Sequence, residues 1–555
     1  MISLPSAQRL IVAFFVSTCL VACEQREPDE ACVFGETCSH YPRDFVVVTD
    51  DAQSEAIYGT AWGSDAVFST KDNLFVSTYK AQSPDPTAES GYSETDGDGY
   101  KDLWGASNIE YASVGADTTH QAFFYATGSL ENSLMVFKET FFETFAKKEH
   151  TTTNTPCDAS YELCDEACRR NCYNQALNES IPIARVFRRS DFGQSSSSNV
   201  LSHPTDIVAW PRTDRIFLFV ASRDGDQVSI FEHNLETQET TSDIDLRYVK
   251  SIETPGPNTL QLIDRNPADN QMELAVLGRN AVQACPDPAK LEAGDLQVAD
   301  LREDFLSVYS VSLNDTTLNG PTKILEQRSS DCVDTELCTK NEALRGAWGL
   351  TLPHNQTDAL LISNRCNNTV LEMSLTVSPD GDNTTQSIQA DRTYSMDQTD
   401  IYEGCDVGPK NLGFKGVAAT SDQVFVASWE TGYILEWDRV NIAKTGDPNA
   451  HCVLGEGRCA LRTCTAVNPN WYLRNESSAN YSPEDSETVG SMRPFPYQIQ
   501  VTDAHLFVSL DRNGLVLNCP RTSTTTTDSG TKTVADNLGL TTVSGFEDCT
   551  IVEQN

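Results

Sequence analysis

The chain has 555 residues, of which 39% are hydrophobic, and this content suffices for a sizeable core and excludes a disordered chain. The net charge of −40 argues against a nucleic-acid partner, because phosphate groups repel such a surface. The length allows several domains or one large repeat architecture.

The N-terminus carries one positive charge, Arg9, ahead of an apolar stretch from Leu10 to Ala22 that is too short for a stable membrane span. This stretch ends in Leu20-Val21-Ala22-Cys23, which resembles a bacterial lipobox. In a lipobox, cleavage before the cysteine leaves that residue as the lipidated N-terminus. The alternative is an ordinary signal peptide that contains a cysteine.

The resemblance implies a signal peptide over 1–22, a lipidated Cys23 and a linker over 23–42. It also implies a cell-envelope protein that lipid holds in a membrane, since a multiply acylated cysteine is a stable anchor. In lipoprotein sorting, the residue after the cysteine, Glu24, is compatible with the outer membrane, which the resemblance therefore implies as the location.

The cysteine count predicts disulfides. The 18 cysteines include Cys19 in the signal and Cys23 at the anchor, which leaves an even sixteen. In an exported chain an even count is typical of disulfides rather than of metal ligands, and Cys32 and Cys38 could form a local pair. CxxC, CxxCH and HExxH motifs are absent from the sequence, which removes the usual support for zinc or haem.

One acidic stretch, "ETDGDGYKD" at residues 94–102, predicts a structural calcium site. It places oxygen ligands at alternate positions around a glycine, and calcium takes six to eight such ligands. The stretch resembles the DxDxDGxxD loops of thrombospondin type 3 and FG-GAP repeats, and the alternative is a solvated acidic turn. The expected ligands are Glu94, Asp96, Asp98, Tyr100 through its carbonyl, and Asp102.

Two segments, at about 137–197 and 440–490, interrupt the strand pattern and read as cysteine-rich, partly helical insertions. Phe137, Phe141 and Phe145 recur at helical spacing, and three further cysteines lie four residues apart. These patterns predict disulfide-stapled helical caps, with a metal cluster as the alternative.

A sequence repeat recurs along the chain. It consists of a short strand, a turn, a strongly apolar strand, a polar turn and a strand in which apolar and polar residues alternate. It reads "PTDIVAWPRTDRIFLFVASRDGDQVSIFEHN" at 204–234, and copies start at Gly349, Gly416 and Tyr497. Weaker copies lie near Ser77, near Thr127, and over 273–280 with 304–313. A small residue closes the middle strand of each clear copy, namely Ser222, Ser363, Ser428 and Ser509.

The irregular spacing of the copies excludes a tight solenoid and suits an all-β fold of the β-propeller type, where insertions leave through loops. Between Ser64 and Asn518 the copies resemble the YVTN and NHL families of propeller repeats. We expect seven blades over 43–555, with a strand from Arg43 closing the ring against the C-terminal blade. The alternative fold is a pair of β-sandwich domains.

Two functions are compatible with this sequence. The favoured one is a binding or scaffold propeller for a protein or glycan partner, because no GxSxG elbow, P-loop or Rossmann pattern occurs. The alternative is a calcium-dependent hydrolase of the lactonase or esterase kind, which the YVTN resemblance implies. Its candidate residues would be His203, Arg223 and Arg365, with His203 and His354 at comparable places in two repeats. No catalytic residue is assigned.

Overall fold

The computed structural model describes mainly the strands of the chain and the turns that join them. The described residues are 42–49, 55–61, 66–71, 74–80, 105–115, 121–138, 184–195, 198–235, 244–278, 304–314, 317–328, 344, 346–365, 368–377, 385–395, 413–429, 433–439, 458–459, 463–466, 496–510, 515–520 and 550–551.

These residues form seven sheets, the blades of a β-propeller, and six of the sheets have four antiparallel strands. Blade 1 contains β1 Pro42–Thr49, β2 Glu55–Ala61, β3 Ala66–Lys71 and β4 Leu74–Lys80. Blade 2 contains β5 Ala106–Val114, β6 Gln121–Gly128, β7 Ser133–Lys138 and β8 Ala184–Arg188. Blade 3 contains β9 Pro204–Arg212, β10 Arg215–Ser222, β11 Gln227–Asn234 and β12 Asp245–Glu253. Blade 4 contains β13 Pro257–Ile263, β14 Gln271–Gly278, β15 Phe305–Asn314 and β16 Thr317–Arg328.

The last three blades follow the same plan with later strands. Blade 5 contains β17 Ala347–Thr351, β18 Ala359–Asn364, β19 Thr369–Val377, β20 Thr385–Ser395 and the short parallel strand β24 Arg458–Cys459. Blade 6 contains β21 Phe414–Ala419, β22 Gln423–Ser428, β23 Tyr433–Asp438 and β25 Thr463–Ala466. Blade 7 contains β26 Pro496–Val501, β27 His505–Leu510, β28 Leu515–Pro520 and β29 Thr550–Ile551.

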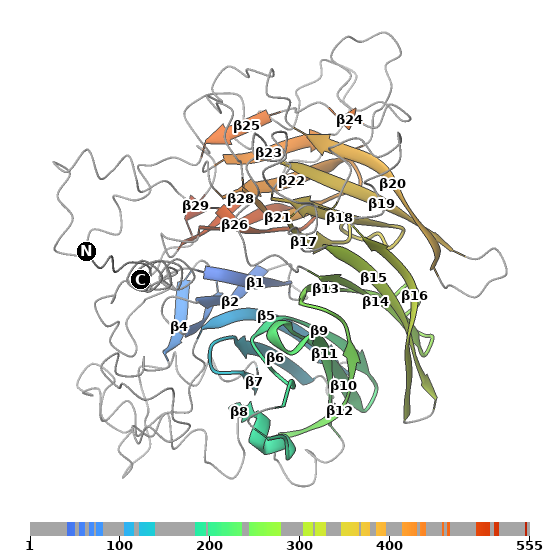
Figure 1. Ribbon diagram of the computed structural model, residues 1–555. Helices are drawn as coiled ribbons and strands as arrows, with labels where there is room; N and C mark the ends of the chain where they lie inside the picture. The colour runs from blue at the N-terminus through green and yellow to red at the C-terminus, as the bar shows by residue number, and fades with distance from the viewer. Residues whose placement is uncertain are drawn as a thin grey trace, which may run out of the picture.

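The blades surround a central axis, with the first strand of each blade innermost (Figure 1). The hydrophobic core is divided among seven clusters, and each cluster fills the layer between two neighbouring blades. The second and third strands are buried on both faces, which explains their near-continuous apolar sequences. The seven-bladed propeller that the repeats predict is therefore confirmed.

Helices are almost absent from the described ranges. They contain two 3-10 turns, Arg189–Phe192 and Arg223–Gly225. No helix in this part of the chain has the length and apolar character needed to cross a membrane. The sequence pattern places Phe137 on a helix. This prediction is wrong, because Phe137 is a buried residue of strand β7. Phe141, Phe145 and the three spaced cysteines lie outside the described residues.

The four clear repeats are confirmed as the first three strands of blades 3, 5, 6 and 7. Their closing serines, however, do not share one position. Ser222 and Ser428 pair with the first residue of their inner strands, whereas Ser363 and Ser509 lie one residue earlier in theirs. A shift of one residue turns a side chain to the other face of a sheet, so the apparent equivalence is wrong.

A β-bulge at the start of the innermost strand occurs in every blade. In blades 5 and 7, a hydroxyl group on the second strand accepts a hydrogen bond from the backbone N–H group that the bulge leaves without a strand partner. Ser363 Oγ accepts the N–H of Gly349 at 2.8 Å, and Ser509 Oγ accepts that of Gln498 at 3.0 Å. The hydroxyl groups of Ser363 and Ser509 therefore stabilise the bulges of blades 5 and 7.

The ring closes without a shared strand, which overturns the expectation that the strand from Arg43 joins the C-terminal blade. Strand β1 pairs with β2 in blade 1, and β29 from the C-terminal end completes blade 7. Side chains join the two blades, as Thr502 Oγ1 donates to Glu55 at 2.8 Å and His505 Nδ1 lies 2.5 Å from the same carboxylate. The weak copy near Ser77 is also misplaced, since Ser77 lies on the fourth strand of its blade.

Candidate functional site

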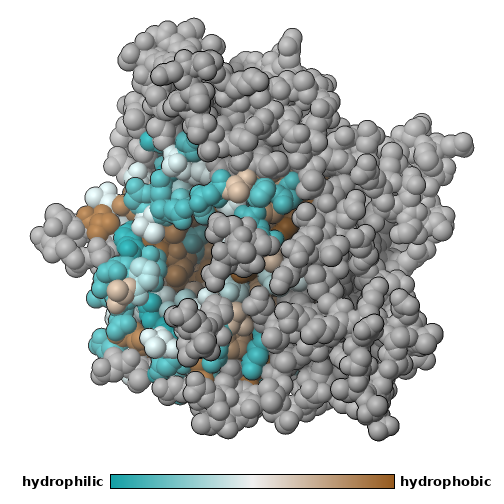
Figure 2. Space-filling view, turned by 180° about the vertical axis from the view of Figure 1, so that it is seen from behind, coloured by the Kyte–Doolittle hydropathy of each residue, from teal (hydrophilic) through white to brown (hydrophobic). Residues whose placement is uncertain are grey.

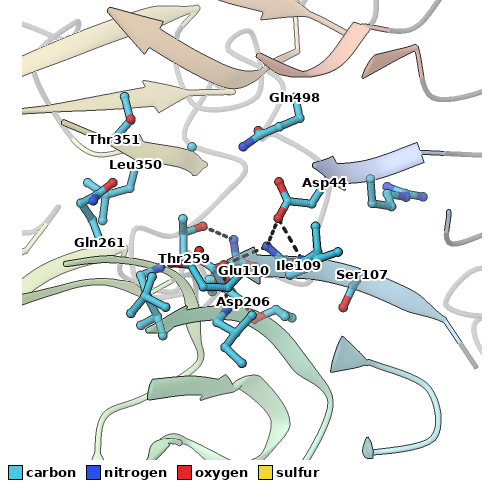
Figure 3. Close-up of a pocket in the computed structure, with 18 of the residues that line it drawn as sticks. Asp44, Ser107, Ile109, Glu110, Asp206, Thr259, Gln261, Leu350, Thr351 and Gln498 are labelled. Atoms are coloured by element: carbon cyan, nitrogen blue, oxygen red, sulfur yellow. Dashed lines mark hydrogen bonds between the residues drawn. The ribbon is translucent and has the colours of Figure 1, made fainter. Parts of the chain in front are cut away.

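A cavity of about 700 Å³ runs along the axis of the propeller, between the innermost strands. This volume lies within the range typical of small-molecule sites, roughly 300–1,000 Å³. Seen from behind Figure 1, hydrophobic residues gather inside a surround of hydrophilic ones (Figure 2). Inside the cavity, polar side chains from opposite blades point toward one another (Figure 3). The cavity is therefore the candidate site.

The common bulge places one side chain of each blade at the same level, at the end where the inner strands begin, which we call the mouth. Blades 2 to 4 contribute a hydroxyl or an amide, whereas blades 5 to 7 and blade 1 contribute aromatic or basic groups. In blade order from blade 1, these side chains are Arg43, Ser107, Thr205, Asn258, Trp348, Lys415 and Tyr497. All except Lys415 line the cavity.

Lys415 is buried behind the mouth among three aromatic rings. Its Nζ lies 4.5 Å from the ring centre of Trp348, 4.0 Å from that of Trp429 and 4.2 Å from that of Tyr497. The rings of Trp348 and Tyr497 meet edge to face at 6.2 Å. Aromatic faces attract an ammonium group, so these rings hold the lysine in place.

Two guanidinium groups extend this cluster. Arg43 lies over Tyr497 at 4.7 Å from the ring centre, and Arg365 lies 5.9 Å from Trp348 and 5.8 Å from Trp429. Three cations and three rings thus form one cluster beside the mouth, in which Arg43, Trp348 and Tyr497 line the cavity and the other three lie behind them. We call this cluster the aromatic–cationic wall. It consists of Arg43, Trp348, Arg365, Lys415, Trp429 and Tyr497.

Carboxylates from blades 1 to 3 form a second wall, the acidic wall, which consists of Asp44, Glu110 and Asp206. Asp44 Oδ2 accepts the N–H of Ile109 at 3.1 Å, and Asp206 Oδ2 accepts the N–H of Leu260 in blade 4 at 2.6 Å. Asn108 donates to both aspartates, at 3.2 and 2.8 Å. These carboxylates therefore join the inner strands of adjacent blades.

Burial raises the pKa of every carboxyl group in the acidic wall. The pKa of Asp44 rises to about 7, with hydrogen bonds from Ile109, Phe45 and Asn108 opposing the rise. The pKa values of Glu110 and Asp206 are also raised well above their usual range, first by burial and then by the other carboxylates. The wall is thus only partly ionised near neutral pH.

The raised pKa of Asp44 predicts a pH-dependent stability. Between its ordinary value of 3.8 and its folded value of about 7, the folded state holds a proton that the unfolded state releases. The free energy of unfolding of the wild type should therefore fall as pH rises through this window, relative to that of Asp44→Asn, by about 1.4 kcal/mol per pH unit. Urea denaturation of both proteins from pH 4 to 8 measures the difference, and parallel stability curves would contradict the assignment.

The histidine and arginine candidates are only partly brought together. His203, Arg223 and His354 line the cavity, but His203 precedes an inner strand and His354 follows one, so their comparable placement is wrong. Arg223 and Arg365 occupy equivalent places in their blades. The backbone N–H group of each donates to the backbone carbonyl of the residue before an inner strand, at 3.2 Å for Arg223 and 2.9 Å for Arg365. Arg365 belongs to the aromatic–cationic wall.

His203 has a backbone conformation that favours glycine. Its φ is +49°, and the residues before four other inner strands, Gly105, Gly256, Gly346 and Gly413, also have positive φ values. Its N–H donates to Asn132 Oδ1 at 2.7 Å, which holds the turn beside the mouth. A histidine in this region costs about 1–2 kcal/mol, so its presence at the cavity is unusual.

The predicted calcium ligands Glu94, Asp96, Asp98, Tyr100 and Asp102 lie outside the described residues, as does the lipidation residue Cys23. Both assignments stay predictions. Among the residues that the structure describes, no group of three or more His, Cys, Asp or Glu side chains could hold a metal ion. The channel-metal arrangement that the hydrolase alternative requires therefore has no support in this part of the chain.

No protein-family model matches the chain, and no curated protein matches it. Among solved structures, it is similar to virginiamycin B lyase from Staphylococcus aureus, with 9% identity, a TM-score of 0.39, and 87% of this chain and 96% of that chain covered. It is also similar to hydrazine synthase from Kuenenia stuttgartiensis, with 8% identity, a TM-score of 0.42 and coverage of 87% and 96%. A third is the Cps50 (Swd1) β-propeller domain of Myceliophteria thermophila, with 8% identity, a TM-score of 0.38 and coverage of 88% and 98%. Structural similarity this distant supports no conclusion about function.

Proposed function

We propose that this chain is a binding propeller that takes a glycan into the mouth of its central cavity. The observation that carries the proposal is the pairing of two rings, Trp348 and Tyr497, with hydroxyl and amide groups on the opposite side of the same mouth. A sugar ring offers an apolar C–H face for aromatic stacking and hydroxyl groups for hydrogen bonds. A concave site with convergent polar groups is typical of ligand binding.

The acidic wall favours binding over hydrolysis. Asp44 and Asp206 accept backbone N–H groups that join blades, and Glu110 accepts a hydrogen bond from the backbone of Ala209. Carboxylates engaged in this way brace the fold. No specific observation therefore supports the calcium-dependent lactonase or esterase alternative. Binding of a protein partner is one of the outcomes that the test below distinguishes.

Truncation of Trp348 tests the proposal. We expect Trp348→Ala to weaken the binding of an oligosaccharide by tenfold or more, because a buried tryptophan anchor contributes about 2 kcal/mol and 1.4 kcal/mol is a factor of ten. Binding is first found on an array of neutral and acidic oligosaccharides, and the dissociation constant is then measured by calorimetry. The backbone oxygen of Trp348, which accepts from Thr259 at 2.7 Å, is unaffected by the substitution.

Tyr248→Ala is the matched control, because Tyr248 is a partly exposed aromatic residue on the outer strand of blade 3. It should bind like the wild type. A Trp348→Ala protein with wild-type affinity, or an array on which the wild type binds no oligosaccharide, would overturn the glycan proposal and favour a protein partner.

We also propose that the propeller is anchored at the cell envelope through Cys23, which the lipobox-like sequence supports. A fatty acid with a clickable tail should label the wild type in growing bacteria and should leave Cys23→Ser unlabelled. Labelling of both proteins would contradict the anchor.

A further inference from the structure

If the cavity binds a glycan, as proposed above, the charges at its mouth indicate which chemical class of glycan it binds. We propose that the sugar carries a carboxylate group and that Arg43 binds this carboxylate directly, with Lys415 adding positive charge from behind the rings. The ligand class is then an acidic saccharide built from uronate-type units.

The distribution of charge carries the first step. The chain has 80 acidic and 40 basic residues, yet three basic side chains belong to one aromatic cluster at the mouth. Arg43 lines the cavity, and Arg365 and Lys415 lie behind it. An acidic surface repels an anion from most directions, so a local cationic wall gives an anion one favourable approach. The aromatic faces that hold these cations also exclude water, which strengthens the attraction of a bound anion.

The geometry of Arg43 carries the second step. It lies at the bulge of blade 1 and lines the cavity, with its Cζ atom 4.7 Å from the ring centre of Tyr497. A guanidinium carries five N–H groups, and two parallel ones match the two oxygens of a carboxylate. The ring of Tyr497 would thus lie beside the sugar unit whose carboxylate Arg43 receives.

The acidic wall carries the third step, since it favours one orientation of such a ligand. Glu110 lines the cavity, where its carboxyl oxygens can accept hydrogen bonds from sugar hydroxyl groups. Ser107 and Thr205 add hydroxyl groups on the same side of the mouth. The sugar would therefore direct its hydroxyl groups toward blades 2 and 3 and its carboxylate toward blades 5 to 7 and Arg43.

The test compares oligomers that differ only in this charge. Galacturonate, mannuronate and glucuronate oligomers are titrated alongside their methyl esters, which keep the linkage and length but lose the negative charge. We expect at least one acid to bind tenfold or more tightly than its ester and to bind less tightly as salt rises. Arg43→Met should lower the affinity for that acid to the affinity for the ester, and Arg43→Lys should restore part of it.

Arg247→Met serves as the control, because it removes one positive charge from an exposed side chain of blade 3 that pairs with Glu232 at 2.8 Å. It should leave the binding of the acid unchanged. Equal affinity for acid and ester, or an unchanged affinity in Arg43→Met, overturns this inference while leaving the glycan proposal standing. Binding of neutral oligosaccharides alone does the same, and binding of no oligosaccharide overturns both.

Discussion

Replacement of Arg439 by methionine is expected to lower the free energy of unfolding by about 3–5 kcal/mol, because it leaves a buried carboxylate without its principal cation. The Arg439 side chain is 7% exposed, and that of its partner Glu372 is 3% exposed. The guanidinium donates to Glu372 Oε1 at 2.9 Å and to the Thr420 carbonyl at 3.0 Å. Urea denaturation of the variant and the wild type measures the loss.

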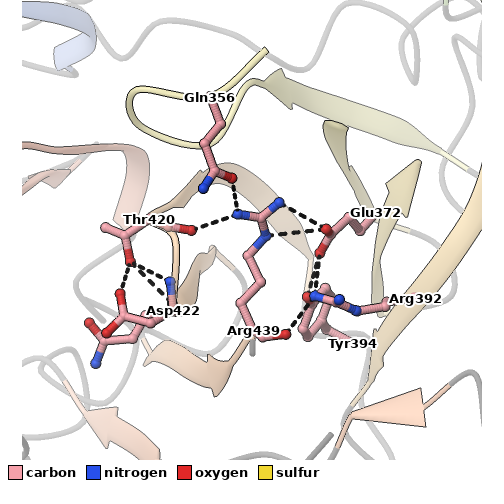
Figure 4. A network of polar contacts seen from close by, with 8 residues as sticks. Gln356, Glu372, Arg392, Tyr394, Thr420, Asp422 and Arg439 are labelled. Atoms are coloured by element: carbon pink, nitrogen blue, oxygen red, sulfur yellow. Dashed lines mark hydrogen bonds and ion pairs between the residues drawn. The ribbon is translucent and has the colours of Figure 1, made fainter. Parts of the chain in front are cut away.

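The surrounding contacts explain the expected size of this effect (Figure 4). Tyr394 donates to Glu372, and Arg392 donates to the backbone carbonyl of Arg439 at 2.6 Å. Glu372 belongs to blade 5 and Arg439 follows the third strand of blade 6, so the ion pair joins the two blades. Replacing both partners by methionine should recover part of the stability, since no buried charge is then left alone.

Arg328→Met is the control for Arg439→Met. Its side chain is 44% exposed and pairs with Glu326 at 2.5 Å, so its removal should cost less than about 1 kcal/mol. Equal losses for the buried and the exposed arginine would refute the argument.

The second large effect is expected for Gly416→Ala, where the innermost strands of blades 6 and 7 approach closely. A Cβ atom at this position would lie 2.6 Å from the Tyr497 carbonyl oxygen and 2.8 Å from two further backbone atoms of Gln498 and Ile499. Backbone of a packed inner strand cannot move aside as a side chain can. We expect a loss of about 3 kcal/mol or more, measured as the fall in thermal or urea stability.

Gly193→Ala separates this steric effect from backbone strain. Gly193 has a φ of +66° and no atom within 4 Å of the position of a Cβ, so its substitution should cost only about 1–2 kcal/mol. If Gly416→Ala is no more destabilising than Gly193→Ala, the close approach of the two strands is not what requires the glycine.

Much of the fold follows from the sequence, because strands buried on both faces produce long apolar runs and the polar turns between them repeat. The register does not follow. Ser222 and Ser363 look equivalent in the repeat, but Ser222 pairs with the first residue of its inner strand, whereas Ser363 lies opposite the bulge of its own. Hydrophobic patterning tolerates that difference, and only the pairing with the neighbouring strand reveals it.

The candidate site was harder to predict for the same reason. Arg43, Trp348, Lys415 and Tyr497 each occur at the start of an inner strand, one residue after a proline, an alanine or a phenylalanine. This position gives a usable signal only after the blades have been aligned on their bulges. The repeats taken alone instead indicate His203, Arg223 and Arg365, the candidates of the hydrolase alternative, and of these Arg365 belongs to the aromatic–cationic wall.

The absence of a shared strand between blades 7 and 1 has a consequence for the order of folding. Almost every sheet is assembled from strands close in sequence, so a blade can form with a short loop-closure step. The contacts between Glu55 and His505 join residues 450 positions apart. The entropy of that closure is repaid only when all seven blades stand in place, so the ring should close last. A chain that lacks any one blade would then keep most of its secondary structure and expose two apolar faces, which makes incomplete chains prone to associate.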